Sequence, residues 1–257
     1  MKNVMITADD YGLSGGICTS IIELLEAGAI SATNVMACMP QAYERCEALK
    51  KAGLVSRVGV HLQVTWENDI SRPLSEPEEV LSLVDERGIF KPVDCEDIID
   101  LDELELEWDR QIRHVIDALG QTPAHLDRHH SIRTIPRGNE VYFKLAKKYG
   151  IPVRGGNKVG LVDGSAYGVQ STTLMTSDWT GTDQPVDVLK ESILENLEKV
   201  GDGVLEIVTH PGYCDDELVK KSPWNENRVN DHKVLLELAK EGWLASQGIR
   251  LFRYEDF

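Results

Sequence analysis

The sequence predicts an α/β protein, a distorted, TIM-like (β/α) barrel with mainly parallel strands, built as a single domain over residues 1–257. Short apolar runs alternate with amphipathic segments of helical period along the chain, which is typical of parallel strands joined by helical crossovers. No internal repeat, low-complexity segment or linker interrupts this alternation. A length of 257 residues is usual for an α/β barrel that forms one domain.

The predicted elements begin with a buried strand at 4–6, followed by a helix over 14–28. Ser14 can cap the start of that helix, and Gly28 can end it. The rest of the chain continues the alternation. Further strands are expected at 32–39, 58–64, 124–130, 151–154, 204–208 and 249–252, further helices at 42–53, 102–119, 139–150, 184–200 and 228–246, and irregular segments at 67–100 and 155–168.

Charge and cysteine content narrow the class of protein. The formal net charge of −16 disfavours binding to nucleic acid, because such proteins need Lys and Arg to displace counterions, and it favours small neutral or cationic ligands. The five cysteines include no Cys-x-x-Cys pair, so neither a disulfide framework nor a thiolate zinc site is expected. The sequence starts without a signal-peptide pattern, and no apolar run reaches membrane-spanning length. We therefore expect a cytoplasmic enzyme without membrane partners.

Two adjacent carboxylates, Asp9 and Asp10, end the first apolar run. Neighbouring strand residues point to opposite sides, but a turn at Gly12 can bring both acids into one cleft. Two like charges this close disfavour joint ionisation unless a cation or a donor compensates. One Asp can then bind a metal while the other acts as a base. Taken alone, however, the pair fits a solvated turn better than a site.

Five of the seven histidines lie at predicted strand ends, where the active sites of β/α barrels form. Each has a structural alternative, as a core histidine, part of a solvated turn or the end of a strand. Their place on one rim with the two acids favours a site, because a carboxylate with two imidazoles suits a divalent metal. The other two, His114 and His232, are expected on helix surfaces. The five at strand ends are His61, His125, His129, His130 and His210.

Four segments together resemble the motifs of the YdjC/ChbG carbohydrate deacetylases, in the same order, and the resemblance extends from end to end. The chain departs from the family pattern at Arg128, where Ser is usual, and at Ser131 and Arg133, where further histidines are usual. The four segments are 7–14 (TADDYGLS), 58–62 (VGVHL), 122–130 (TPAHLDRHH) and 206–213 (EIVTHPGY).

The resemblance implies a metal-dependent hydrolase that removes N-acetyl groups from amino sugars, with short chitin-derived oligosaccharides as the expected substrates. It implies a divalent ion, Mg²⁺ or Zn²⁺, bound by Asp10, His61 and His129. Asp9 then takes the role of general base toward the attacking water, and His210 that of general acid toward the departing sugar amine. The resemblance also makes a homodimer an expectation.

Further residues are candidates for contact with the substrate or for support of the site. Asp127 is expected to orient a histidine and Arg154 to hold Asp9 charged, although each equally fits a structural ion pair. An exposed indole, such as that of Trp224, can stack on a sugar face unless it fills the core of its own loop. The candidate substrate residues are His125, Asp127, Arg154, Tyr213, Trp66 and Trp179.

Two other functions remain open from the sequence. One is a different metal-dependent sugar enzyme, such as an isomerase or another amidase. The His-rich rim counts against an isomerase, since such enzymes tend to bind metal through several Glu and Asp side chains. The other is a non-catalytic regulator that binds a sugar. The presence of a residue for every chemical role counts against this alternative.

Overall fold

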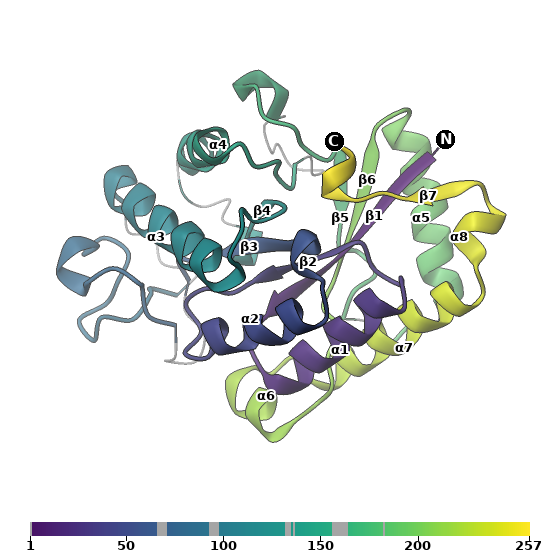
Figure 1. Cartoon of the computed structure of the whole chain (residues 1–257), viewed down its shortest axis with the longest axis horizontal. Coiled ribbons are helices and arrows are strands. Elements are labelled where there is room, and N and C mark those ends of the chain that lie inside the picture. Colours follow the sequence, from purple (N-terminus) through teal and green to yellow (C-terminus); the bar gives the residue numbers. More distant parts are fainter. Residues whose placement is uncertain are drawn as a thin grey trace.

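The computed structural model describes residues 2–65, 71–92, 98–131, 135, 137–155, 164–181 and 183–257. At its centre is a curved sheet in the order β4-β3-β2-β1-β6-β5, with β7 also paired to β1 (Figure 1). Every pairing between these strands is parallel. The strands are β1 (Lys2–Tyr11), β2 (Ala32–Val35), β3 (Val58–Leu62), β4 (Leu126–Arg128), β5 (Leu174–Thr176), β6 (Val204–Thr209) and β7 (Ile249–Leu251).

Helices line the outside of this sheet (Figure 1). Each turns an apolar face inward, and together these faces form the main core cluster with the outward side chains of the strands. None of the described helices combines the length and apolarity needed to cross a membrane. The helices are α1 (Gly15–Glu26), α2 (Ala42–Lys51), α3 (Leu101–Leu119), α4 (Gly138–Tyr149), α5 (Val186–Val200), α6 (Asp216–Lys221), α7 (Glu226–Lys240) and α8 (Trp243–Ser246).

Single bridges connect the two edges of the sheet. Val153 pairs in parallel with Leu126 of β4 on one side and with Ser171, just before β5, on the other. A main-chain hydrogen bond of 2.9 Å from Arg154 N to Leu126 O accompanies the first bridge. Another of 2.9 Å, from Val153 N to Gln170 O, accompanies the second. The parallel segments therefore form a distorted barrel, which confirms the predicted fold.

Most predicted elements are confirmed with small shifts of their ends. The strand predicted at 151–154 is reduced to two isolated bridges at Val153. The helix predicted over 228–246 is two helices, α7 and α8, because Gly242 adopts a φ of 62° and turns the chain between them. The sequence does not predict β5 and α6, because segments of three and six residues are too short to show a clear period.

A bulge in β1 places the two adjacent acids. Ala8 pairs with Thr33 and Tyr11 with Val35, so β1 has one more residue than β2 between these pairs. Asp10 takes the left-handed conformation, with a φ of 70°, which Asp tolerates better than most residues. Both acids thus remain inside the strand, and the bulge rather than a turn at Gly12 changes their direction.

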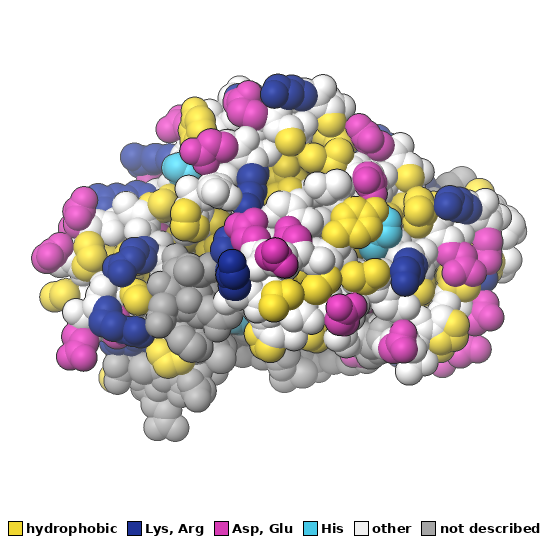
Figure 2. Space-filling view, turned by 90° about the horizontal axis from the view of Figure 1, so that it is seen from below, with side chains coloured by type: hydrophobic (Ala, Val, Ile, Leu, Met, Phe, Trp, Pro, Cys, Tyr) yellow, Lys and Arg dark blue, Asp and Glu magenta, His cyan; other side chains and the backbone are white. Residues whose placement is uncertain are grey.

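One face of the molecule, which carries α1, α6 and α7, is shown in Figure 2. Lys and Arg side chains are dispersed there among Asp and Glu, and hydrophobic side chains are interspersed with both. The described residues of this face therefore form no basic stripe of the kind that binds nucleic acid.

We predict that Gly59→Ala destabilises the fold by about 3 kcal/mol, the upper end of the usual cost of overpacking. A Cβ on Gly59 of β3 would lie 2.4 Å from ring atoms of His125. That ring cannot move away easily, because it is fully buried and stacked on Tyr254 with 4.0 Å between centroids. Urea unfolding measures the change.

Gly53→Ala is the matched control, because a Cβ there meets no atom within 4 Å. This control variant should lose only about 1 kcal/mol of stability, because alanine is strained in the left-handed backbone conformation at a φ of +69°. A Gly59→Ala variant as stable as the wild-type protein would contradict the packing described around His125.

Candidate active site

Three potential ligand atoms converge at the C-terminal ends of the strands. Asp10 Oδ1 lies 3.4 Å from His61 Nε2 and 3.5 Å from His129 Nδ1. The two imidazole nitrogens lie 3.2 Å apart. All three side chains are buried, and Asp10 Oδ1 has no hydrogen-bond partner among the described residues. A buried carboxylate oxygen beside two imidazole nitrogens fits a divalent cation that keeps positions open for other ligands.

Asp127 sets the orientation of the His61 ring. Its Nδ1 lies 2.5 Å from Asp127 Oδ1, so that nitrogen carries the proton and donates it to the carboxylate. Nε2 is then directed toward Asp10 and His129, and its lone pair becomes available when a cation takes the place of the second proton. A carboxylate that holds the second nitrogen of a ligand histidine is the usual support of a metal site.

The pKa values of two residues in the ligand set, His61 and Asp10, are strongly shifted. Burial would lower the pKa of His61, but Asp127 and Asp9 outweigh it and raise this pKa to about 10. Burial would raise the pKa of Asp10, yet it lies well below its usual range because of Arg228 and the two histidines. Asp10 is therefore anionic, and the surroundings of His61 favour positive charge.

Arg228 of α7 is a second partner of Asp10. Its Nη2 donates to Asp10 Oδ2 at 2.7 Å, and the residue is 3% exposed. Arg228 thereby occupies the Oδ2 oxygen and leaves Oδ1 turned toward the histidines. The guanidinium also fixes the carboxylate of Asp10 in its ionised form.

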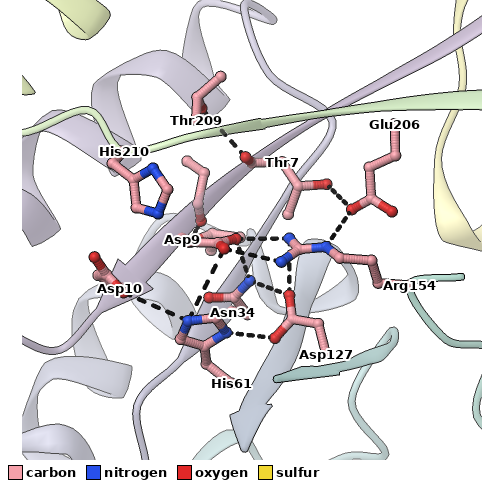
Figure 3. A network of polar contacts seen from close by, with 12 residues as sticks. Thr7, Asp9, Asp10, Asn34, His61, Asp127, Arg154, Glu206, Thr209 and His210 are labelled. Carbon is pink, nitrogen blue, oxygen red and sulfur yellow. Dashed lines mark hydrogen bonds and ion pairs between the residues drawn. The ribbon is translucent and has the colours of Figure 1, made fainter. Parts of the chain in front are cut away.

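Asp9 is held by a different arginine (Figure 3). Arg154 Nη1 donates to Asp9 Oδ2 at 2.9 Å and Nη2 donates to Oδ1 at 2.6 Å, which makes a bidentate pair. Asn34 Nδ2 adds a third hydrogen bond of 2.7 Å. Asp9 Oδ2 lies 3.9 Å from His61 Nε2, so this carboxylate is adjacent to the ligand set without belonging to it.

A second cluster, formed by Asp9, His61 and Asp127, also has three potential ligand atoms close together. Donors already occupy its carboxylates, because Arg154 and Asn34 each bond to both Asp9 and Asp127. A cation there would face a guanidinium. The set of Asp10, His61 and His129 therefore fits a metal better.

Arg154 reaches further into the barrel. Its Nη2 lies 2.9 Å from Asp127 Oδ2, and its Nε donates to Glu206 Oε1 at 3.0 Å (Figure 3). These carboxylates raise the pKa of the buried guanidinium well above its ordinary value, although burial acts in the opposite direction. With Asp10 included, the cluster has four buried carboxylates and two buried guanidiniums. A divalent cation would balance the excess negative charge.

His210 directly follows β6 and is anchored by two residues. Its main-chain N–H lies 3.0 Å from both Thr180 Oγ1 and Asp231 Oδ2. Its Nδ1 lies 3.1 Å from Thr180 Oγ1, and the Thr180 hydroxyl donates to Asp231. The imidazole is thus held through Nδ1, which leaves Nε2 available for chemistry.

The environment of His210 keeps its ring neutral. Burial lowers its pKa to about 4, and Arg228 lowers it further. The nearby carboxylates of Asp10 and Asp9 act in the opposite direction without prevailing. At neutral pH the resting side chain therefore carries no charge.

Several predicted substrate residues are enclosed by the fold. His125 and Asp127 are fully buried, and Trp179 is 2% exposed. A buried side chain presents no face to a sugar, so their placement favours a supporting role rather than contact. Trp66 lies outside the described residues.

Tyr213 faces helices rather than the ligand set. Its hydroxyl donates to Glu23 of α1 and lies 3.1 Å from Nε2 of His232 on α7. The prediction that His232 lies on a helix surface is wrong. This histidine is 6% exposed because it lies between α1 and α7, where its Nδ1 is 2.8 Å from Ser20 Oγ.

Five residues of the site are not predicted from the sequence. Two of them, Asn34 and Glu206, are polar residues within apolar strands, and this was the available signal. The helical and loop residues give no such signal, because polar residues are common there. The five are Asn34, Thr180, Glu206, Arg228 and Asp231.

Comparison with known proteins gives consistent matches over the length of the chain. A carbohydrate deacetylase of Thermoanaerobacter pseudethanolicus is 32% identical, over 99% of this chain and 98% of that protein. A crystal structure from Enterococcus faecalis, described as a cellobiose-phosphate cleavage protein, superposes with a TM-score of 0.84 at 28% identity and covers 99% of this chain and 98% of that one.

A more distant likeness concerns the fold alone. A CE4 esterase from Streptococcus mutans gives a TM-score of 0.52 at 12% identity, over 98% of this chain and 85% of that one. The model of the family described as YdjC-like protein matches residues 3–246. The chain therefore belongs to the YdjC-like family.

Proposed function

We propose that this protein is a metal-dependent deacetylase that removes N-acetyl groups from amino sugars, with short chitin-derived oligosaccharides as substrates. The observation that carries the proposal is the division of two adjacent acids between different partners. Asp10 turns one oxygen toward two histidines, whereas Asp9 is clamped by Arg154 beside them. The relatives named carbohydrate deacetylases support the same activity.

In this proposal Asp10, His61 and His129 hold a divalent ion, Mg²⁺ or Zn²⁺. When bound, such an ion polarises a carbonyl oxygen and lowers the pKa of water. Asp10 Oδ1, which has no hydrogen-bond partner among the described residues, suits either ion, and the Nε2 atom of His61 suits Zn²⁺ once its proton is displaced.

Asp9 serves as the general base that takes a proton from the attacking water. The bidentate pair with Arg154 restricts the rotation of this carboxylate. Its oxygen, 3.9 Å from His61 Nε2, lies within reach of a water beside the ligand set.

His210 delivers a proton to the departing amine. Its pKa of about 4 makes the protonated imidazole a strong acid, which suits transfer to a poor leaving group. Because the resting ring is neutral, His210 has to take up a proton before it acts as the acid, and the proton that Asp9 removes from the attacking water balances this step. Asp231 and Thr180 hold the imidazole in place for both steps.

Trp224 offers a surface for the sugar beside this acid. Its ring centroid lies 5.0 Å from that of His210, and the residue is 37% exposed. The indole packs against Gly181, where a Cβ would come within 1.9 Å of its Cζ2 atom. The held, partly exposed indole is suited to stacking on the apolar face of an amino sugar.

We predict that Asp10→Ala, His61→Ala and His129→Ala each weaken Zn²⁺ binding more than 10-fold, since loss of even an outer-shell partner costs about 10–100-fold. Equilibrium dialysis with metal quantification measures the affinity. His114→Ala is the control, because that histidine lies on α3 away from the cluster. Unchanged affinity in all three ligand variants would contradict the assigned site.

We predict that the wild-type protein releases acetate from the diacetylated chitin disaccharide and that a chelator abolishes the release. Asp9→Asn should lower kcat by about 10²–10⁴-fold, the usual contribution of a general base, while Zn²⁺ affinity stays close to that of the wild type. An Asp9→Asn variant with normal turnover would exclude Asp9 as the base. Rearranged sugar without acetate would instead indicate an isomerase.

We predict that Trp224→Ala raises KM for the disaccharide about 3–10-fold, in line with the ~0.5–1.5 kcal/mol of an aromatic contact, and that Trp224→Phe retains most of the affinity. Hydrolysis of a small acetyl ester that lacks a sugar should be unaffected in both variants. Equal losses on both substrates would contradict a role in sugar stacking.

A further inference from the structure

The C-terminal segment forms the floor of the barrel. β7 pairs with the first residues of β1, and Phe252 N then donates to Val4 O. A small apolar cluster, separate from the main core, surrounds this segment at the N-terminal ends of the strands. Its buried members are Met5, Ala32, Val204, Phe252 and Tyr254.

Tyr254 leads from this floor into the polar interior. Its hydroxyl lies 3.1 Å from each carboxylate oxygen of Glu206, and its ring stacks on His125 with an interplanar angle of 6°. The side chain is 4% exposed, and burial raises its pKa well above the ordinary value. At neutral pH the phenol is therefore a hydrogen-bond donor to Glu206.

Glu206 is a fully buried carboxylate whose oxygens are occupied by donors. Besides Tyr254, it accepts hydrogen bonds from Thr7 Oγ1 at 2.8 Å and Thr172 Oγ1 at 2.9 Å. The remaining donor is Arg154 Nε, at 3.0 Å. Donors that converge from several elements hold this carboxylate in one orientation.

The guanidinium of Arg154 transmits that orientation. It is planar and rigid, so a carboxylate that holds its Nε edge also sets the direction of its Nη atoms. Those atoms bond to Asp9 and Asp127, the carboxylates beside and behind the ligand set. A continuous path of contacts thus joins the end of the chain to Asp9.

We infer that Tyr254 is a positioning residue for the reaction, acting through Glu206 and Arg154 on Asp9. The role of Asp9 in this inference rests on the proposed function, whereas the effect on Arg154 does not. Loss of the Tyr254 hydroxyl leaves the buried carboxylate of Glu206 with fewer hydrogen-bond donors and lets the guanidinium of Arg154 turn. The C-terminal segment then positions a residue of the proposed active site in addition to closing the floor of the barrel.

Tyr254→Phe tests the inference. We expect kcat for acetate release to fall about 10-fold with KM within about 2-fold, because base alignment is lost while sugar contacts remain. We also expect the Arg154 Nε–H, followed by NMR, to exchange with solvent about 10-fold faster. Tyr11→Phe is the matched control, because it removes a buried phenol that donates to Arg45 O at 2.8 Å.

A double-mutant cycle separates this path from general destabilisation. If Tyr254 acts through Glu206, Tyr254→Phe lowers kcat no further in a Glu206→Gln background. Additive losses, or a Tyr254→Phe variant that matches Tyr11→Phe in both kcat and exchange, would overturn the inference. A wild-type protein without acetate release, combined with faster Arg154 exchange in Tyr254→Phe, would uphold the positioning and reject the proposed function.

Discussion

The guanidinium of Arg154 is the constraint on which the interior of the barrel depends. It bonds to Asp9, Asp127 and Glu206, which come from β1, β4 and β6. Without this cation, three buried carboxylates would lie close together, each desolvated and repelled by the others. Arg154 follows Val153, which makes two isolated bridges, so the least regular part of the barrel wall supplies its central charge.

A second constraint separates two chemically identical neighbours. The bulge in β1 lets both Asp9 and Asp10 face the barrel mouth, and each then meets its own arginine. Arg154 takes both oxygens of Asp9, whereas Arg228 takes one oxygen of Asp10 and leaves the other for the histidines. In the proposed function, the base and the metal ligand differ because of these partners rather than because of the residues themselves.

The sequence predicts the barrel and the histidines at its rim because both depend on local pattern. Strand ends can be located from apolar runs. His129 and His210 directly follow β4 and β6, and His61 is the last residue but one of β3. Contacts between residues far apart in the sequence leave no local sequence pattern. Arg228 and Asp231 lie on α7 with ordinary helical spacing, and only the packed structure brings them to Asp10 and His210. Burial is equally hard to foresee, as the enclosed side chains of His125 and Trp179 show.

The location of a bound ion tests the central claim most directly. Anomalous X-ray diffraction from crystals grown with Zn²⁺ should give a peak about 2.0–2.2 Å from Asp10 Oδ1, His61 Nε2 and His129 Nδ1. Asp9 should remain bonded to Arg154 in the same crystals. A peak between Asp9, His61 and Asp127, the competing cluster, would contradict the assigned division of the two acids.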